Sequence, residues 1–105
     1  MAQFDVHHSP GRRQDYPYVV VVQPSQFDDY PRRLVIPLAR FGEAAARRHP
    51  DLTPRIAIAG DVPYLDPLQL QTVPVSALGP AIASLAEDSD RIIKAIDAVI
   101  TRAWG

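Results

Sequence analysis

Arginine is the residue type in this chain whose placement most directly suggests chemistry. The arginines include three adjacent pairs, each in or beside an expected loop: Arg12-Arg13, Arg32-Arg33 and Arg47-Arg48. A guanidinium group donates paired hydrogen bonds in a fixed plane, so these pairs suit phosphate groups or an acidic protein partner. The simpler interpretation is that they are exposed loop charges that favour solubility, and without another observation we prefer it.

The histidines and carboxylates do not form a recognisable catalytic or metal-binding motif. His7 and His8 are adjacent, and neighbours on a strand point to opposite faces. His49 is the third histidine, and the chain has no cysteine, so we interpret all three as surface histidines. Separated acids of expected turns provide no carboxylate pair: Glu43, Asp61 and Asp66. The chain also lacks a glycine-rich phosphate loop, a GxSxG motif and an HExxH motif, so we expect no catalytic residue, no metal and no cofactor.

The composition is that of an ordinary globular protein. Hydrophobic residues make up 47% and charged residues 22% of the 105 residues, and the net charge is −1. A near-neutral chain lacks the basic surplus typical of nucleic-acid-binding proteins. No segment approaches the roughly 20 apolar residues of a membrane span, and the absence of cysteine fits the cytosol. We expect a single domain over residues 1–105 that is soluble and cytoplasmic.

Eleven prolines divide the chain into short segments, as expected for strand ends and turns. The apolar segments between them predict strands at 2–7, 18–23, 34–38, 55–59, 62–65 and 68–75. The continuous β-branched run at 18–23 indicates a strand covered on both faces. Pro37 indicates a bulge or an unpaired position near the end of its strand. Helices are predicted at 39–49, 77–85 and 88–104, which gives a mainly β fold with one long helix.

The segment 88–104 has the clearest helical pattern in the chain. At about 100° per residue, its apolar side chains fall within one arc of roughly 140°: Ile92, Ile93, Ile96, Val99, Ile100, Ala103 and Trp104. Trp104 is the only tryptophan and lies at the edge of this arc. Such a residue either closes the core of its own domain or anchors a partner. The pattern alone leaves both interpretations open.

Several segments together carry a resemblance to a known family. They are Gln3-Phe4, LVIPLA at 34–39, IAGD at 58–61 with Tyr64, TVPVSALG at 72–79, and Trp104-Gly105 after the isoleucine-rich helix. They occur in the family's order and cover essentially the whole chain. On these residues the chain resembles CcdB, the toxin of a bacterial type II toxin–antitoxin pair.

The resemblance implies a small SH3-like β-barrel of the CcdB/MazF type with one long C-terminal helix, assembled as a symmetric homodimer. CcdB-like toxins are not enzymes. They bind the DNA gyrase A subunit and trap the gyrase–DNA cleavage complex. A CcdA-like antitoxin neutralises them through a disordered segment, and DNA is contacted only through the antitoxin or gyrase, including in autoregulation of transcription.

The resemblance also assigns candidate site residues. The gyrase-binding set is Trp104, Gly105, Gln3 and Phe4. The antitoxin-binding set follows from charge instead, because an acidic antitoxin segment would be expected to use the arginine-bearing loops: Arg12, Arg13, Arg47 and Arg48.

The chain departs from the family's pattern at three places, which keeps two alternatives open. No isoleucine follows Gly105, His7 stands where tyrosine is common, and Trp104 lies three residues further along the helix. One alternative is a CcdB homologue that binds an antitoxin without poisoning gyrase. The other is a MazF-like endoribonuclease, which needs a general base beside a cationic group. For that chemistry the sequence offers arginines but no convincing base.

Overall fold

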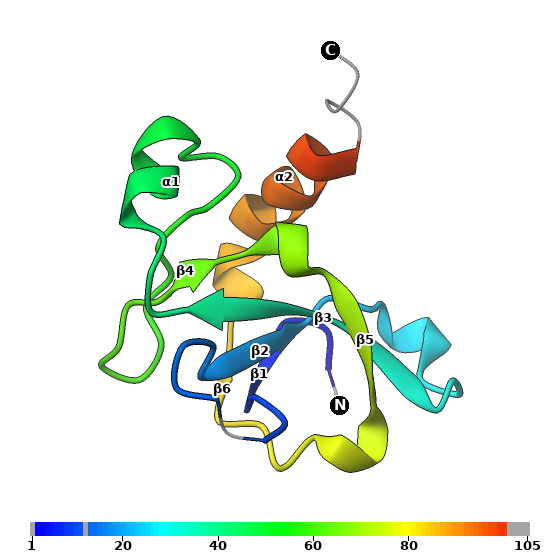
Figure 1. The fold of residues 1–105 in the computed structure, drawn as a ribbon. Coiled ribbons are helices and arrows are strands. Elements are labelled where there is room, and N and C mark those ends of the chain that lie inside the picture. The colour runs from blue at the N-terminus through cyan, green and yellow to red at the C-terminus, as the bar shows by residue number, and fades with distance from the viewer. Residues whose placement is uncertain (1, 12, 101–105) are drawn as a thin grey trace.

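An eight-residue strand lies at the centre of a curled antiparallel sheet in this computed structural model, which describes residues 2–11 and 13–100 (Figure 1). The elements follow the chain in this order: β1 (Asp5–His8), β2 (Tyr18–Val21), η1 (Ser25–Phe27), β3 (Arg32–Ala39), α1 (Glu43–Arg48), β4 (Tyr64–Leu65), η2 (Pro67–Gln69), β5 (Gln71–Pro74), η3 (Val75–Ala77), β6 (Ala83–Ser84), η4 (Ala86–Asp88) and α2 (Ser89–Ile100). The strand order is β4-β3-β2-β1-β6, and β5 also pairs with β3. The sheet forms a half-barrel beside a C-terminal helix, so the mainly β fold expected from the sequence is confirmed.

Pro37 explains why two short strands share one edge of β3. Val22 donates its backbone N–H to Leu34 across the β2–β3 pair, at 2.9 Å. Because antiparallel hydrogen-bonded pairs alternate, the Val19–Pro37 pair is a non-hydrogen-bonded one, and the Pro37 nitrogen points to the opposite edge. That position falls between the end of β4 and the start of β5, where the Pro37 carbonyl accepts the Asp66 N–H at 3.0 Å. The absent proline donor therefore costs no strand pairing.

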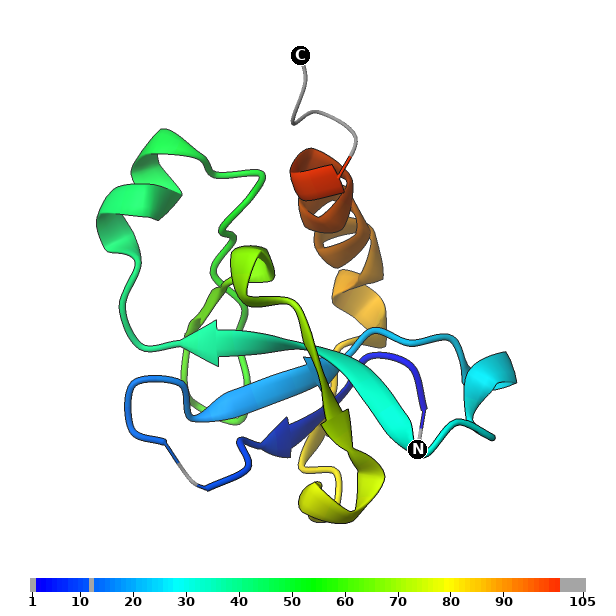
Figure 2. The ribbon, with the colours of Figure 1, turned by 45° about the vertical axis from the view of Figure 1, so that its right-hand side comes forward.

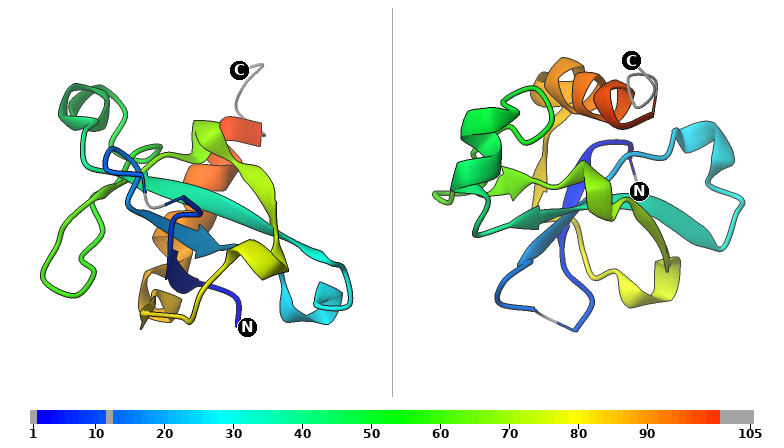
Figure 3. Two further views of the ribbon diagram at one scale, coloured as in Figure 1. Left: turned by 60° about the horizontal axis from the view of Figure 1, so that its bottom comes forward. Right: turned by 45° about the horizontal axis from the view of Figure 1, so that its top comes forward.

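The β2 strand is covered on both faces, as its uninterrupted β-branched sequence predicts. Val20 and Val22 belong to the larger apolar cluster, which also contains residues of β1, β3 and α2. Val19 and Val21 point the other way, into a smaller cluster with Val35 and Val73. Figure 3 shows α2 lying across one face of the sheet, which is the face of the larger cluster.

The closing helix is held by a narrow line of side chains. Ile92 and Ala95 have no exposed surface, whereas Ile93 is 47% and Ile100 is 60% exposed. The predicted apolar arc is thus wider than the face that the sheet covers. The last predicted residues, 101–104, lie outside the described residues. No helix among the described residues is both long and apolar enough to span a membrane.

Two sequence-based predictions of regular structure are wrong. The segment 55–59 forms only isolated bridges, Arg55 with Tyr64 and Ile58 with Asp61, although Ile56 and Ile58 are buried as its alternation suggests. The segment 77–85 is not a helix, because its backbone extends the pairing of β1. Ile82 donates to the Val6 carbonyl at 2.8 Å, and β6 continues the ladder. A short helix has little intrinsic stability to compete with such pairing.

The other predicted boundaries shift by a few residues. The first predicted strand, 2–7, becomes β1 at Asp5–His8, and the helix predicted at 39–49 shrinks to α1. Strand β3 continues to Ala39, and Gly42 then turns the chain with a φ of 127°, a value that favours glycine. The helix begins only after this turn.

The adjacent isoleucines of α2 provide a matched test of the packing. We expect Ile92→Ala to lower the free energy of unfolding by about 3 kcal/mol, because it leaves a cavity in the core. We expect Ile93→Ala to lower it by less than about 1 kcal/mol, since its side chain is already half exposed. Urea unfolding followed by circular dichroism measures both, and equal losses would contradict the described orientation of α2.

Candidate functional site

A histidine and two arginines line a cavity of about 450 Å³ beside the loop between β1 and β2. The lining residues are His8, Arg13, Gln14, Pro17 and Arg40. The antiparallel order brings the end of β1, the start of β2 and the end of β3 to one edge of the sheet. The Arg40 N–H donates to the Asp15 carbonyl at 3.0 Å, which ties the loop to the end of β3. The topology of the sheet therefore positions the cavity.

Asp61 holds Arg40, one of the two arginines that line this cavity. Its carboxylate accepts the Tyr18 hydroxyl at 3.0 Å and contacts the Arg40 guanidinium at 2.8 Å, while the Val62 N–H donates to its other oxygen at 2.9 Å. Asp61 itself ends a tight turn in which Ala59 and Gly60 have φ values of 45° and 87°. Two successive positive φ values are typical of a type I′ hairpin turn. The Gly60-Asp61 hairpin connection expected from the sequence is present in this form.

The environment fixes the charge of both partners of this network. Burial, and then the hydrogen bond to Asp61, raises the pKa of Tyr18, so its hydroxyl stays a donor. Burial works to raise the pKa of Asp61, but hydrogen bonds from Tyr18 and Val62 and the charge of Arg40 outweigh it and lower that pKa. At neutral pH a tyrosine donor, a carboxylate and a guanidinium therefore coexist.

Arg13 is the less firmly held of the two arginines that line the cavity, because its contacts are weak. Its guanidinium lies 3.4 Å from Asp15 and 4.9 Å from the centre of the Tyr16 ring. Both partners of the ion pair are more than half exposed, so the pair contributes at most about 1 kcal/mol. An incoming anion can displace Asp15 at little cost.

This arrangement suits anion binding. Two guanidinium groups can hold a phosphate or carboxylate, and the exposed His8 adds an imidazole at the same cavity. The described residues contain no group of three histidines or acids that could hold a metal ion.

The gyrase-binding and antitoxin-binding residues assigned from the sequence do not lie together in one site. Arg13 lines the cavity above, while Arg48 lines a different one beside α2. Arg47 precedes it in the last turn of α1. Arg12, Trp104 and Gly105 lie outside the described residues.

Gln3 and Phe4 lie next to each other but face different surroundings. The Gln3 amide donates to the Val22 carbonyl at 3.0 Å and is partly exposed. Phe4 is only 9% exposed and belongs to the larger apolar cluster, with a φ of 71°. Its side chain packs in the core. Phe4 can therefore affect the binding of a partner only indirectly, by fixing the conformation of the residues around it.

Three interpretations of polar residues need correction. His7 is buried, with Nδ1 2.8 Å from the Gly79 carbonyl, because the chain after η3 covers that face of β1. Arg33 is also buried, and its guanidinium donates to the Tyr30 and Asp28 carbonyls at 2.5 and 3.0 Å. Asp61 is not a solvated turn acid but the centre of a network. Its partners are far apart in sequence, so no local signal reveals them.

Comparison with known proteins agrees with this fold. The sequence model of the family described as CcdB protein matches residues 3–102. No protein with a curated description matches the chain. Among solved structures, the chain is similar to an endoribonuclease from mycobacterial species in complex with its cognate antitoxin. The TM-score is 0.71 at 11% sequence identity, and the match covers 100% of this chain and 97% of that one. At this identity the likeness concerns the fold alone.

The Asp61 network predicts a pH-dependent contribution to stability. Because the pKa of Asp61 is lowered on folding, its carboxylate stabilises the fold above its unfolded pKa of about 4, and the contribution is lost as the pH falls through the folded value. We expect Asp61→Asn to lower the free energy of unfolding by about 1 kcal/mol at pH 7, and the gap from the parent chain to close on acidification below about pH 4. Urea unfolding between pH 3 and 7 measures this gap.

Asp15→Asn is the matched control for that measurement. It removes a carboxylate from an exposed arginine pair, so we expect a change of a few tenths of a kcal/mol at pH 7. A gap for Asp61→Asn that stays constant with pH would contradict the assigned ionisation.

Proposed function

The chain belongs to the CcdB protein family, a family of toxins from toxin–antitoxin systems, and we propose that it binds the DNA gyrase A subunit and is neutralised by a CcdA-like antitoxin. The observation that carries the proposal is the family match over residues 3–102, which takes in the whole of α2. The proposed action is the trapping of the gyrase–DNA cleavage complex.

The form of α2 supports a role for its far end. The helix is anchored at Ile92 and Ala95, and its last turns rise away from the sheet (Figure 2). Ile100 is exposed there. Trp104 and Gly105 follow, and we assign them the principal contact with gyrase, since tryptophan is a frequent interface anchor. Gln3 and Phe4 complete the proposed gyrase-facing set, Phe4 by shaping the backbone and not by direct contact.

We also propose that the chain acts as a symmetric homodimer. A dimer presents two copies of one surface to a partner that is itself symmetric. Phe27 and Tyr30 supply an exposed aromatic pair, in edge-to-face contact at 6.4 Å, of the kind that a second copy covers. In this proposal the toxin reaches DNA only through gyrase or the antitoxin, and it works without a cofactor.

For the antitoxin we propose contact with the arginines of the loops and of α1. Arg13 offers a weakly held charge beside the 450 Å³ cavity, and Arg47 and Arg48 extend from the last turn of α1. Arg12 belongs to the same proposal by sequence. An acidic, disordered antitoxin segment would find complementary charge at these places.

RNA cleavage is a second candidate because of one observation. His8 lies at the cavity that holds Arg13 and Arg40, so an imidazole stands beside cationic groups on one surface. That combination can bind a phosphodiester and move a proton. The sequence alone offered no such base, since His8 acquires its setting only when three strands align.

The first prediction concerns gyrase. We expect the purified chain to inhibit supercoiling by gyrase and to stabilise cleaved DNA, and Trp104→Ala to weaken both effects by about thirtyfold or more, as for a hot-spot anchor worth at least about 2 kcal/mol. Arg13→Ala is the control and should retain full inhibition. A chain that binds an antitoxin but leaves gyrase unaffected would instead be a non-poisoning homologue.

The second prediction separates the two candidate functions. We expect the chain to leave a mixed RNA pool intact at concentrations that inhibit gyrase. Cleavage of that pool, reduced about a hundredfold or more by His8→Ala, would replace the gyrase proposal with an endoribonuclease. Gel analysis of end-labelled RNA with both proteins distinguishes these outcomes.

A further inference from the structure

Two cavities adjoin at Arg13, on the loop between β1 and β2. One is the 450 Å³ cavity that Arg40 and His8 also line, and we call it the anion cavity. The other has a volume of about 180 Å³ and lies against the smaller apolar cluster, whose Val19 and Val73 line it. We call this second cavity the slot. One arginine side chain thus joins two cavities of different character.

The anion cavity has two of its side chains placed by one carboxylate. Asp61 contacts Nη1 of Arg40 at 2.8 Å, and because a guanidinium carries several N–H donors, Arg40 keeps donors for a second anion. Asp61 also accepts the Tyr18 hydroxyl, and the Tyr18 ring lies 6.0 Å from the His8 ring. The arginine and the ring beside the histidine are therefore fixed before any ligand arrives.

The charge of the anion cavity matches a single phosphate group. Each of its two arginines already has one carboxylate, Asp15 at 3.4 Å from Arg13 and Asp61 at 2.8 Å from Arg40. The exposed Asp15 is easily displaced, and two guanidinium groups can then share the phosphate oxygens. The chain has a net charge of −1 and lacks the basic surplus that binds a row of phosphates. A ligand with one phosphate is favoured over a nucleic-acid strand.

The slot combines apolar walls with a polar edge. Its lining residues are Pro10, Val19, Pro37 and Val73, with Ser9, Tyr16 and Gln71. The hydroxyls of Ser9 and Tyr16 already donate to the Tyr16 carbonyl and to Asp66. The Gln71 amide has no hydrogen-bond partner among the described residues, and it offers both a donor and an acceptor.

The size and the polar edge of the slot suit one nucleobase. Its volume is below the roughly 300–1,000 Å³ of ordinary ligand sites, so it admits one ring system and not a larger molecule. The edge of a base presents adjacent donors and acceptors, which is the pattern that an amide such as that of Gln71 can pair with. Valine and proline side chains supply apolar contact for the faces of the ring.

We propose that the two cavities together bind a nucleoside monophosphate, with the phosphate between Arg13 and Arg40 and the base in the slot beside Gln71. Arg13 stands where the two parts of such a ligand join. This site goes beyond the proposed contacts with gyrase and the antitoxin. It also differs from RNA cleavage, because the ligand is held and no bond is broken.

The experiment titrates the full chain with each of the four ribonucleoside 5′-monophosphates by isothermal calorimetry. We expect saturable binding of at least one of them with a Kd of about 1 mM or lower. The matching nucleoside and inorganic phosphate are titrated separately. We expect each to bind about tenfold more weakly or worse, because each fills only one of the two cavities.

Two variants assign the ends of the ligand. We expect Arg13→Gln to weaken nucleotide binding about tenfold, since it removes a charged hydrogen-bond donor to the phosphate. We expect Gln71→Leu to weaken it about fivefold while leaving the binding of inorganic phosphate unchanged. A merely structural effect of Gln71 would not separate these two ligands.

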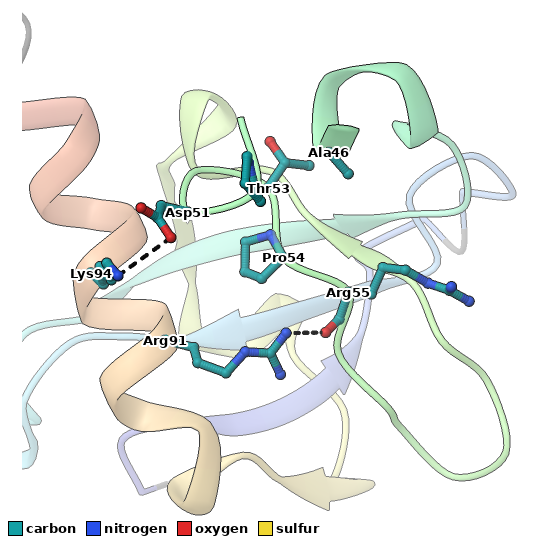
Figure 4. A pocket seen from close by; sticks show the side chains of 8 residues that line it. Ala46, Asp51, Thr53, Pro54, Arg55, Arg91 and Lys94 are labelled. Carbon is teal, nitrogen blue, oxygen red and sulfur yellow. Dashed lines mark hydrogen bonds and ion pairs between the residues drawn. The ribbon is translucent and has the colours of Figure 1, made fainter. Parts of the chain in front are cut away.

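Lys94→Gln is the matched control. Lys94 lies 3.4 Å from Asp51 at a different cavity, of about 380 Å³, between α2 and the segment that carries Asp51 (Figure 4). Its ion pair is exposed, as that of Arg13 is. We expect nucleotide binding by this variant to stay within about twofold of the parent chain, and an equal loss in both variants would contradict the assigned place. Thermal unfolding confirms that each variant keeps its fold.

Three further results would overturn the proposal. They are no saturable binding of any of the four nucleotides, inorganic phosphate that binds as tightly as the best nucleotide, and a single-stranded RNA of about ten nucleotides that binds about a hundredfold more tightly through Arg13. Gyrase inhibition by the parent chain is measured separately. The nucleotide site can fail while gyrase inhibition stands, and nucleotide binding without gyrase inhibition keeps this inference and removes only the proposed target.

Discussion

The packing of Ile92 and Ala95 onto the sheet is the contact on which the surfaces of this protein depend. At about 100° per residue, fixing these two side chains inward fixes every other side chain of α2. Arg91 and Lys94 then face the segment 46–55, and Ile93 projects on the other flank. One buried line of a twelve-residue helix thereby sets both the side that carries Arg91 and Lys94 and an exposed apolar side.

The sequence predicts elements well where the cause is local. A continuous β-branched run made β2 recognisable, and a 3.6-residue period made α2 recognisable. The sequence predicts elements poorly where a segment pairs with residues that are far away in the sequence. The segment 55–59 alternates like a strand but pairs only at single bridges, and 77–85 yields to the free edge of β1. Both outcomes depend on what lies beside the segment, which no local pattern contains.

The same reasoning applies to the candidate site. Tyr18, Arg40 and Asp61 come from three separate parts of the chain and meet only because β2, β3 and a tight turn end at one edge of the sheet. Arg33 resembled a loop charge because it lies beside an expected loop, yet its side chain is buried and donates to the Asp28 and Tyr30 carbonyls. The resemblance to a family supplied the architecture, while the distribution of charge over the surface came from the structure.

The likeness to an endoribonuclease at 11% sequence identity shows that very different sequences adopt this one architecture. Pro37 illustrates how this architecture also protects itself. Between β4 and β5 the edge of β3 is covered by η2 of the same chain, and Asp66 donates its N–H to the Pro37 carbonyl there. An uncovered edge is a template on which chains aggregate. Because Pro37 has no N–H and its carbonyl is already paired, this residue leaves no free backbone group to which a strand from another molecule could pair.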